Sequence, residues 1–173
     1  TEATESLIEA LDDPDSETRI SVIWALASLG DAAVVPKLVE LYRSDDPGVR
    51  KMAIYALGSL DGEIQLKTLR TALADPALDV QWNAAVALAR HGDDRGARVL
   101  ARMLDRDYVA ARVTASETLN DPASEVMVSG LRASGALGAD EGDDVWMRIQ
   151  TLADADESLR VRQAALETLE ALG

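Results

Sequence analysis

The sequence predicts an all-α fold, an α-solenoid of about five stacked helical hairpins. The main observation is a repeated pattern, in which an anchor residue is followed three positions later by Val or Ala and seven positions later by Leu. The first four copies are spaced 31 residues apart, and the five anchors are Arg19, Arg50, Gln81, Arg112 and Arg162. A fixed period of this length is typical of stacked supersecondary units rather than of one globular core.

Composition is the second observation. Of the 173 residues, 47% are hydrophobic but only 3% are aromatic, and Phe is absent. Ala and Leu are strong helix formers, and small side chains let neighbouring helices approach closely. No stretch of about 18 apolar residues occurs, so we expect a soluble protein. The absence of cysteine excludes disulfide bonds and thiolate metal sites, and it is compatible with the cytoplasmic location that we expect.

The charge of the chain is strongly acidic, with 31 Asp and Glu against 17 Lys and Arg and a net charge of −14. Nucleic acids and anionic membrane surfaces are bound through Lys and Arg, so neither is an expected partner. Only three of the basic residues are Lys. An Asp-rich, Lys-poor surface favours a halophilic source, although an ordinary acidic protein stays an equal alternative. Melting curves across salt concentrations would separate the two.

Each repeat is predicted to contain two helices joined by an acidic turn, because apolar residues recur at helical spacing. The expected first helices are Glu2–Leu11, Ala32–Arg43, Glu63–Ala74 and Asp94–Leu104. The expected second helices are Ser16–Leu29, Pro47–Leu60, Ala77–His91 and Asp107–Asn120. Asp in the turns is expected to cap the second helices, and Pro is tolerated in a first helical turn. Left-handed glycines are expected to end the first three, at Gly30, Gly62 and Gly92.

The array is predicted to be irregular after its fourth copy, because Arg112 and Arg162 are 50 residues apart. We expect a helix at Ser124–Leu137 that breaks the strict pairing, and a last pair formed by Val145–Ala153 and Ser158–Leu172. The whole chain is then one repeat array, with its units at about residues 1–30, 31–61, 62–92 and 93–120, an irregular segment at 121–144 and a last unit at 145–173. Because the chain begins at Thr1 without Met, we expect a trimmed fragment or excised domain.

The anchor arginines are predicted to have a structural role. They fall near the edge of the buried arc of the second helix, where a charge needs a partner. Carboxylates in the turn of the adjacent repeat are the expected partners, and the candidates are Asp13, Asp46, Asp75 and Asp105. Ligand recognition by these arginines is the less favoured alternative.

The repeat resembles the HEAT-like repeat of the phycobilisome lyase type, most closely in the sequence from Asp46 to Gly58 and less closely from Asp75 to Leu88. The resemblance covers about residues 1–120 and 145–173. It implies a right-handed superhelix whose second helices line the concave side. Members of this family are mostly protein-binding scaffolds, and some attach or detach bilin chromophores, so the resemblance alone favours no single function.

Large side chains gather at the outward positions of three consecutive second helices, and Trp24, Tyr55 and Trp82 are the aromatic ones. If the repeats stack in register, these residues form one strip across the concave face. We call this set the aromatic strip; its predicted members are Ile20, Trp24, Lys51, Met52, Tyr55, Trp82, Asn83, Val86 and Arg90. Exposed Trp and Tyr are frequent binding hot spots. The alternative is that the terminal extension folds over the strip, or that these rings cap gaps in the core. The corresponding positions of the later repeats (Val113, Thr114, Glu117, Gln163 and Glu167) predict a more polar surface there.

Little in the sequence indicates catalysis. The single histidine, His91, is better explained as a helix-end residue, and paired histidine metal sites are excluded by count. The acidic segment Asp140–Asp144 lacks the spacing of a calcium loop, so a solvated loop is favoured over a Ca²⁺ or Mg²⁺ site. No phosphate-binding or nucleophile motif occurs. We expect no cofactor and no metal.

Three functions stay open. The favoured one is a non-enzymatic scaffold that binds a protein or peptide, with the aromatic rings as anchors; Ile20, Met52 and Val86 fill the spaces, and Lys51, Asn83 and Arg90 orient the ligand. The second is a bilin lyase-like enzyme or its subunit, which rests on the resemblance alone. The third is a homodimer that buries the strip.

Overall fold

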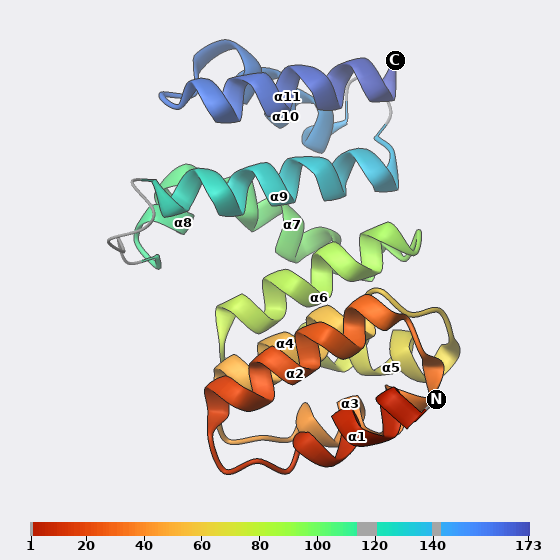
Figure 1. Cartoon of the computed structure of the whole chain (residues 1–173). Helices are drawn as coiled ribbons and strands as arrows, with labels where there is room; N and C mark the ends of the chain where they lie inside the picture. Colours follow the sequence, from red (N-terminus) through yellow and green to blue (C-terminus); the bar gives the residue numbers. More distant parts are fainter. Residues whose placement is uncertain (1, 114–120, 140–142) are drawn as a thin grey trace. The chain divides into compact units, whose positions relative to one another are not determined.

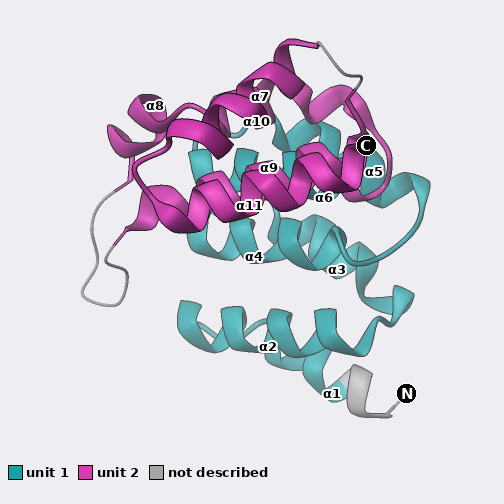
Figure 2. Cartoon of the chain, turned by 90° about the horizontal axis from the view of Figure 1, so that it is seen from above, with its two compact units in different colours: residues 1–87 teal, residues 88–173 magenta. Residues whose placement is uncertain are grey.

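The computed structural model describes residues 2–113, 121–139 and 143–173, and all regular elements in these ranges are helical. The chain forms two compact units, residues 1–87 and residues 88–173, which Figure 2 shows in two colours. The predicted all-α class is therefore confirmed for the described residues. None of the described helices is long and apolar enough to cross a membrane.

The first unit is a stack of helical hairpins (Figure 1). Second helices α2 (Ser16–Leu29) and α4 (Pro47–Leu57) pack against each other, α1 packs on α2, and α3 packs on α4 and α5. The remaining helices are α1 (Glu2–Ala10), α3 (Val35–Leu41, preceded by the 3₁₀ turn η1, Ala32–Val34), α5 (Glu63–Ala72) and α6 (Leu78–Arg90), whose last residues belong to the second unit. The predicted helices of this unit are confirmed, apart from shifts of a few residues at their ends.

The ends of these helices follow the predicted capping chemistry in most places. Asp15 accepts the backbone N–H of Thr18 at 2.7 Å, and Asp46 accepts that of Gly48 at 2.7 Å. Gly30 is left-handed, as expected for a residue that ends a helix. Gly62 differs from the prediction: its φ of 142° lies outside the left-handed helical region, and it precedes α5 rather than ending α4.

The core of this unit lies along one arc of each second helix. In α4 the fully buried residues stand one before the anchor Arg50 and three, four, six and seven after it, and they are Val49, Ala53, Ile54, Ala56 and Leu57. Close approach of helices is visible at Gly58, where an added Cβ would lie 2.5 Å from Cβ of Ala87 in α6. Small residues are therefore required where second helices meet.

The anchor arginine of the second repeat, Arg50, connects the turn before its own helix with the turn of the following repeat. We call this set of hydrogen bonds the arginine clamp. The Nε and Nη2 atoms of Arg50 each donate to the carboxylate of Asp75 at 3.0 Å, and Nη1 donates to the carbonyl oxygens of Ser44 and Asp45. The Asp75 side chain is only 3% exposed, and its hydrogen bonds raise the pKa of Arg50. The predicted partnership between the anchor and the adjacent turn is confirmed here.

The other two anchors of this unit bond differently. Arg19 donates to the backbone oxygens of Asp13 and Pro14 and to the Ser16 hydroxyl, rather than directly to a carboxylate. Gln81 donates to the backbone oxygen of Asp75 at 2.6 Å. All three anchors therefore tie the start of their own second helix to the turn before it, and Arg50 also reaches the next repeat.

The second unit contains the 3₁₀ turn η2 (Asp94–Gly96) and helices α7 (Ala97–Met103), α8 (Arg106–Ala110), α9 (Pro122–Leu137), α10 (Asp144–Ala155) and α11 (Leu159–Leu172). Helix α9 packs against α7, α8 and α11, and α10 packs against α11. One apolar cluster unites α9, α10 and α11, with Met127, Leu131, Ile149 and Val161 among its buried members. The predicted helices in 124–137, 145–153 and 158–172 are confirmed.

The predicted second helix at Asp107–Asn120 is confirmed only at its start, because residues 107–110 are helical and residues 111–113 are not. Helix α8 ends at Ala110, and residues 114–120 lie outside the described residues. Arg112 is exposed; it donates to the backbone oxygen of Tyr108 and stacks 3.8 Å from the centre of its ring. The fourth copy of the sequence pattern therefore does not provide a buried anchor.

Helix α9 takes the place of that second helix. It packs on α7 and α11, just as α4 packs on α3 and α2. Its buried residues fit the α4 pattern when Ser124 is taken as the anchor, since they stand one before it and three, four, six and seven after it; they are Ala123, Met127, Val128, Gly130 and Leu131. The prediction that this helix breaks the pairing is thus corrected: it belongs to the stack of second helices.

Ser124 stands at the anchor position of α9 but has no guanidinium group. In this unit the guanidinium group belongs to Arg106 in α8. Its Nε and Nη2 atoms donate to Asp156 at 2.9 and 2.6 Å, and Nη2 also donates to the Ser124 hydroxyl at 3.2 Å. Asp156 is 2% exposed and accepts the backbone N–H of Ser158, as Asp75 accepts that of Ala77. The two units therefore contain the same clamp with arginines from different positions.

We expect Arg50→Ala to lower the free energy of unfolding by about 3–5 kcal/mol, because it leaves the Asp75 carboxylate buried without its partner. Arg43→Ala, which removes an exposed arginine of the same unit, is the control and should change stability by about 0.5 kcal/mol or less. Urea unfolding followed by circular dichroism measures both. Equal effects of the two substitutions would contradict the clamp.

The cap of α9 makes stability depend on pH. Hydrogen bonds from the Ser124 hydroxyl and amide lower the pKa of Asp121 below 3.8. The stabilisation is therefore complete above pH 3.8 and is lost as the pH falls through the folded-state pKa. Asp121→Ala should cost about 1 kcal/mol at pH 7 and less at pH 3. Urea unfolding at both pH values measures this, with the exposed Asp154→Ala as control; a pH-independent difference would contradict the cap.

Candidate functional site

The predicted aromatic strip lies on the second helices of the first unit, with one exception. Ile20 and Trp24 lie on α2, and the middle members lie on α4. Helix α6 carries the rest, and its Arg90 belongs to the second unit. Because α2 and α4 pack side by side, the strip residues of these two helices are neighbours along the stack.

Two of the three aromatic rings are exposed as predicted. The Trp24 side chain is 59% exposed and that of Tyr55 is 44% exposed. They occupy the same position, five residues after the anchor, in consecutive second helices. Around them Ile20, Met52 and Val86 are half-buried. The exposed aromatic residues of the strip therefore lie on α2 and α4, and Arg90 of α6 is exposed as well.

Trp82 differs from the prediction, because it is buried and only 6% exposed. It stands one residue after the anchor; in α2 the corresponding Ile20 is half-buried and lies 3.4 Å from where a Cβ of Gly48 would stand. The alternative that some of these rings fill the core holds for Trp82.

The polar members of the strip contact α6. Lys51 Nζ lies 3.9 Å from the Asp79 carboxylate, and the Asn83 amide donates to the backbone oxygen of Asp79 at 2.7 Å. Asn83 is thus partly occupied within its own helix, whereas the Lys51–Asp79 pair is exposed and weak. Of these two predicted orienting residues, Lys51 is the more available for a ligand.

The chemistry of the strip is that of a binding surface. Its members include no carboxylate, histidine, serine or cysteine, and Lys51 and Tyr55 are the strip residues that could take part in proton transfer. Among the described residues no group of His, Cys, Asp or Glu is arranged to hold a metal ion. Of the acidic segment Asp140–Asp144, residues 140–142 lie outside the described residues. The same holds for Thr114 and Glu117, so the predicted polar continuation is not described there.

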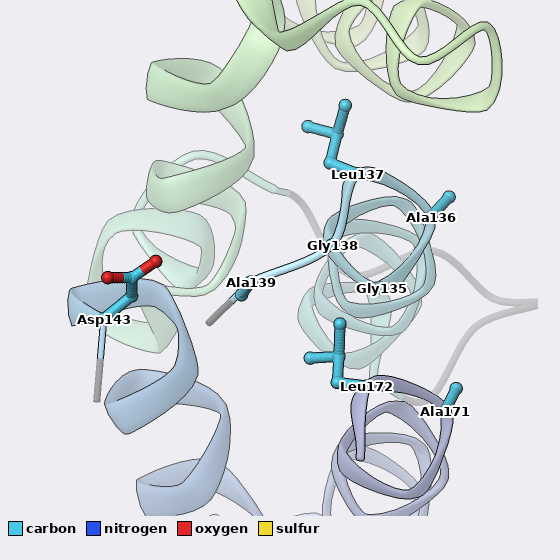
Figure 3. A pocket seen from close by; sticks show the side chains of 8 residues that line it. All are labelled: Gly135, Ala136, Leu137, Gly138, Ala139, Asp143, Ala171 and Leu172. Carbon is cyan, nitrogen blue, oxygen red and sulfur yellow. The ribbon is translucent and has the colours of Figure 1, made fainter. Parts of the chain in front are cut away.

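A shallow pocket of about 570 Å³ lies in the second unit at the ends of α9 and α11 (Figure 3). Among the described residues that line it, Leu137 and Leu172 contribute the largest apolar side chains and Asp143 contributes the only charged one. No predicted strip residue lines this pocket. It holds no arrangement of catalytic groups.

Two exposed leucines of α11 were missed by the sequence analysis. Leu159 is 74% exposed and Leu166 is 47% exposed. The signal that could have found Leu166 is its position, four residues after the anchor Arg162, which is occupied by buried apolar residues in the other second helices. This feature is separate from the aromatic strip.

The stacked hairpins, their small-residue contacts and the arginine clamps define the class of helical-repeat proteins. Residues 4–79 match the family described as HEAT repeats. The fold of the chain is an α-solenoid, similar to HEAT-like repeat proteins and to a phycocyanin lyase chain.

Solved structures are similar over nearly the whole chain. One is a chain from the complex of CpcE and CpcF of phycocyanin lyase from Nostoc sp. PCC7120, with 26% identity and a TM-score of 0.69 over 98% of this chain. This chain spans 64% of the length of that lyase chain.

Two engineered proteins share the fold alone. A designed armadillo repeat protein has 20% identity and a TM-score of 0.53, over 99% of this chain and 83% of its own. Another engineered protein has 22% identity and a TM-score of 0.51, over 99% of this chain and 79% of its own. No curated protein sequence matches this chain.

We expect Trp82→Ala to lower the free energy of unfolding by about 3–5 kcal/mol, because it empties a buried volume. Trp24→Ala should change it by about 0.5 kcal/mol or less, since most of that ring is already in water. Thermal and urea unfolding of the two variants beside the wild type measures the contrast. Similar losses for both would show that Trp24 also belongs to the core.

Proposed function

We propose that this protein is a non-enzymatic scaffold that binds a protein or peptide through the exposed part of the aromatic strip. Trp24 and Tyr55 are the anchoring rings, and the half-buried Ile20, Met52 and Val86 extend the apolar area around them. Lys51 is placed to orient the ligand. Trp82 supports the surface from within rather than contacting the partner.

One observation carries this proposal: two large aromatic side chains stand exposed at equivalent positions of adjacent helices. Only five described residues elsewhere are large, hydrophobic and exposed, and they are Leu29, Ile64, Met147, Leu159 and Leu166. Exposed Trp and Tyr side by side bury much area at low entropic cost when a partner covers them. The similar chain from the CpcE–CpcF structure is itself part of a protein complex.

The alternative is a bilin lyase-like enzyme or subunit, in which a flat conjugated ligand stacks on Trp24 and Tyr55. Its support is the similarity to a phycocyanin lyase chain. The strip includes no carboxylate, histidine or serine, so chromophore transfer would have to use Lys51 and Tyr55 or groups from a partner. Nucleic acids and membrane surfaces are not proposed as partners, because the chain has a net charge of −14.

The scaffold proposal predicts that Trp24→Ala and Tyr55→Ala lose a partner that the wild type retains. The immobilised protein is incubated with an extract of the organism that encodes it, and the retained proteins are identified by mass spectrometry. Ile64→Ala is the matched control, because Ile64 is 61% exposed on a first helix, away from the strip. If the strip variants and the wild type retain the same proteins, the strip is not the binding surface.

A free bilin distinguishes the alternative. The scaffold proposal predicts that adding a bilin to the wild-type protein leaves the visible absorbance of the pigment unchanged. A shifted band in the wild type that is absent in Trp24→Ala, but kept in Ile64→Ala, would support the lyase-like function instead. Absorption spectroscopy of the three proteins at equal concentration is sufficient.

A further inference from the structure

The exposed ring of Tyr55 lies in the interior of the first unit. Helix α4, which carries it, packs on α2, and at Gly58 it approaches α6 so closely that an added Cβ would lie 2.5 Å from Cβ of Ala87. Tyr55 is nevertheless 44% exposed, and Trp24 at the equivalent position of α2 is 59% exposed. The two rings therefore share a face of the second helices that packing between repeats leaves open.

The charges on this face are mainly negative. Glu17 precedes Trp24 by seven residues, which places both on one side of α2; it is exposed and forms no ion pair with any residue that the structure describes. Lys51 precedes Tyr55 by four residues on α4, and its Nζ atom lies 3.9 Å from the exposed carboxylate of Asp79. Asp79 therefore offsets the one positive charge beside Tyr55, while the charge of Glu17 stays uncompensated.

The other basic residues of the first unit do not change this balance. Arg19 and Arg50 are half-buried and donate to the turns at the start of their own helices. The rest lie on or directly after the first helices, which form the other layer of the stack; they are Lys37, Arg43, Lys67 and Arg70. The open face of the second helices is therefore the acidic side of an acidic unit.

The ends of α2 and α4 contribute in the same direction. The C-terminal end of a helix carries a partial negative charge that a basic residue usually offsets, and neither helix has a basic residue in its last turn. Tyr55 stands two residues before the end of α4, and Trp24 stands five residues before the end of α2. The faces of aromatic rings also attract cations. A cationic side chain is thus favoured by the rings, the carboxylates and the helix ends together.

We propose that the segment bound by the exposed part of the aromatic strip is a cationic peptide, with Arg or Lys side chains over Trp24 and Tyr55 and one paired with Glu17. This inference rests on the proposed function, because it specifies the ligand of the same surface. Lys51 stays beside Asp79 and donates to a backbone oxygen of the peptide. An acidic or phosphorylated segment is repelled.

Two synthetic peptides test the sign of the charge. One alternates Ala and Arg, the other alternates Ala and Glu, and fluorescence anisotropy of a dye-labelled sample of each measures binding to the whole chain. We expect the Ala–Arg peptide to bind and the Ala–Glu peptide not to bind.

Replacing the rings tests where the cationic peptide binds. Trp24→Leu and Tyr55→Leu keep an apolar side chain but remove the ring, and each should weaken binding of the Ala–Arg peptide by about two- to fivefold. Trp146→Leu is the control, because it removes an indole from α10 in the second unit and should leave the affinity unchanged. Circular dichroism verifies that each variant is folded.

A pair of charge variants separates a local contact from the general attraction of an acidic chain. Glu17→Gln should weaken binding of the Ala–Arg peptide by about two- to fivefold, because it removes the carboxylate beside Trp24. Glu9→Gln removes the same charge from an exposed position of the first helix α1, and it should leave the affinity nearly unchanged.

The outcomes distinguish this inference from the function on which it rests. Equal binding of the Ala–Arg peptide to the wild type and to the ring and Glu17 variants would overturn the cationic ligand, and so would binding of the Ala–Glu peptide at equal affinity. If Trp24→Ala and Tyr55→Ala still lose a partner from the extract in that case, the scaffold function stands with a ligand of different charge. If they lose none, the scaffold function fails as well.

Discussion

Each of the two units contains one buried hydrogen-bonded junction at the start of a second helix, and the stacking of its helices depends on it. In the first unit this junction is the bidentate contact of Arg50 with Asp75, and in the second it is that of Arg106 with Asp156. The carboxylate in each case also caps the turn that leads into the next second helix. One ion pair therefore sets both where a second helix begins and how far it stands from its neighbour. The apolar side chains of neighbouring second helices then pack at that distance. The helices are close enough that position 58 requires a glycine.

Most of the fold could be predicted from the sequence because its determinants are local. Helical spacing of apolar residues, an Asp before the first turn and a Gly after the last are encoded within each repeat, so the helices of the first unit were placed nearly correctly. The fourth repeat was misplaced because the pattern at Arg112 matched the period but lacked the Asp-Pro pair that begins a second helix. That pair is present at Asp121-Pro122, where α9 begins. The capping residues therefore predicted the start of this second helix better than the 31-residue spacing did.

The candidate site was predicted only in part, because exposure depends on packing that a helical projection omits. Position along the helix correctly placed Trp24 and Tyr55 in solvent. It failed for Trp82, which is buried although Ile20 and Met52 at the same position of their helices are half-buried. The functional roles of the strip residues stay predictions, because they depend on the partner that binds there. Leu166 of α11 was missed because its position is a buried one in the other second helices.

The arginine of the second clamp, Arg106, belongs to α8 rather than to α9. This has a consequence for the evolution of such chains. Arg106 precedes residues 111–120, whereas Asp121, Ser124 and Asp156, which it contacts, all follow them. The described residues of the junction are therefore encoded on either side of this connection, so a change in its length leaves all of them present. Related proteins can then differ in the length of the connection between α8 and α9. An epitope or recognition sequence would be inserted at the same place.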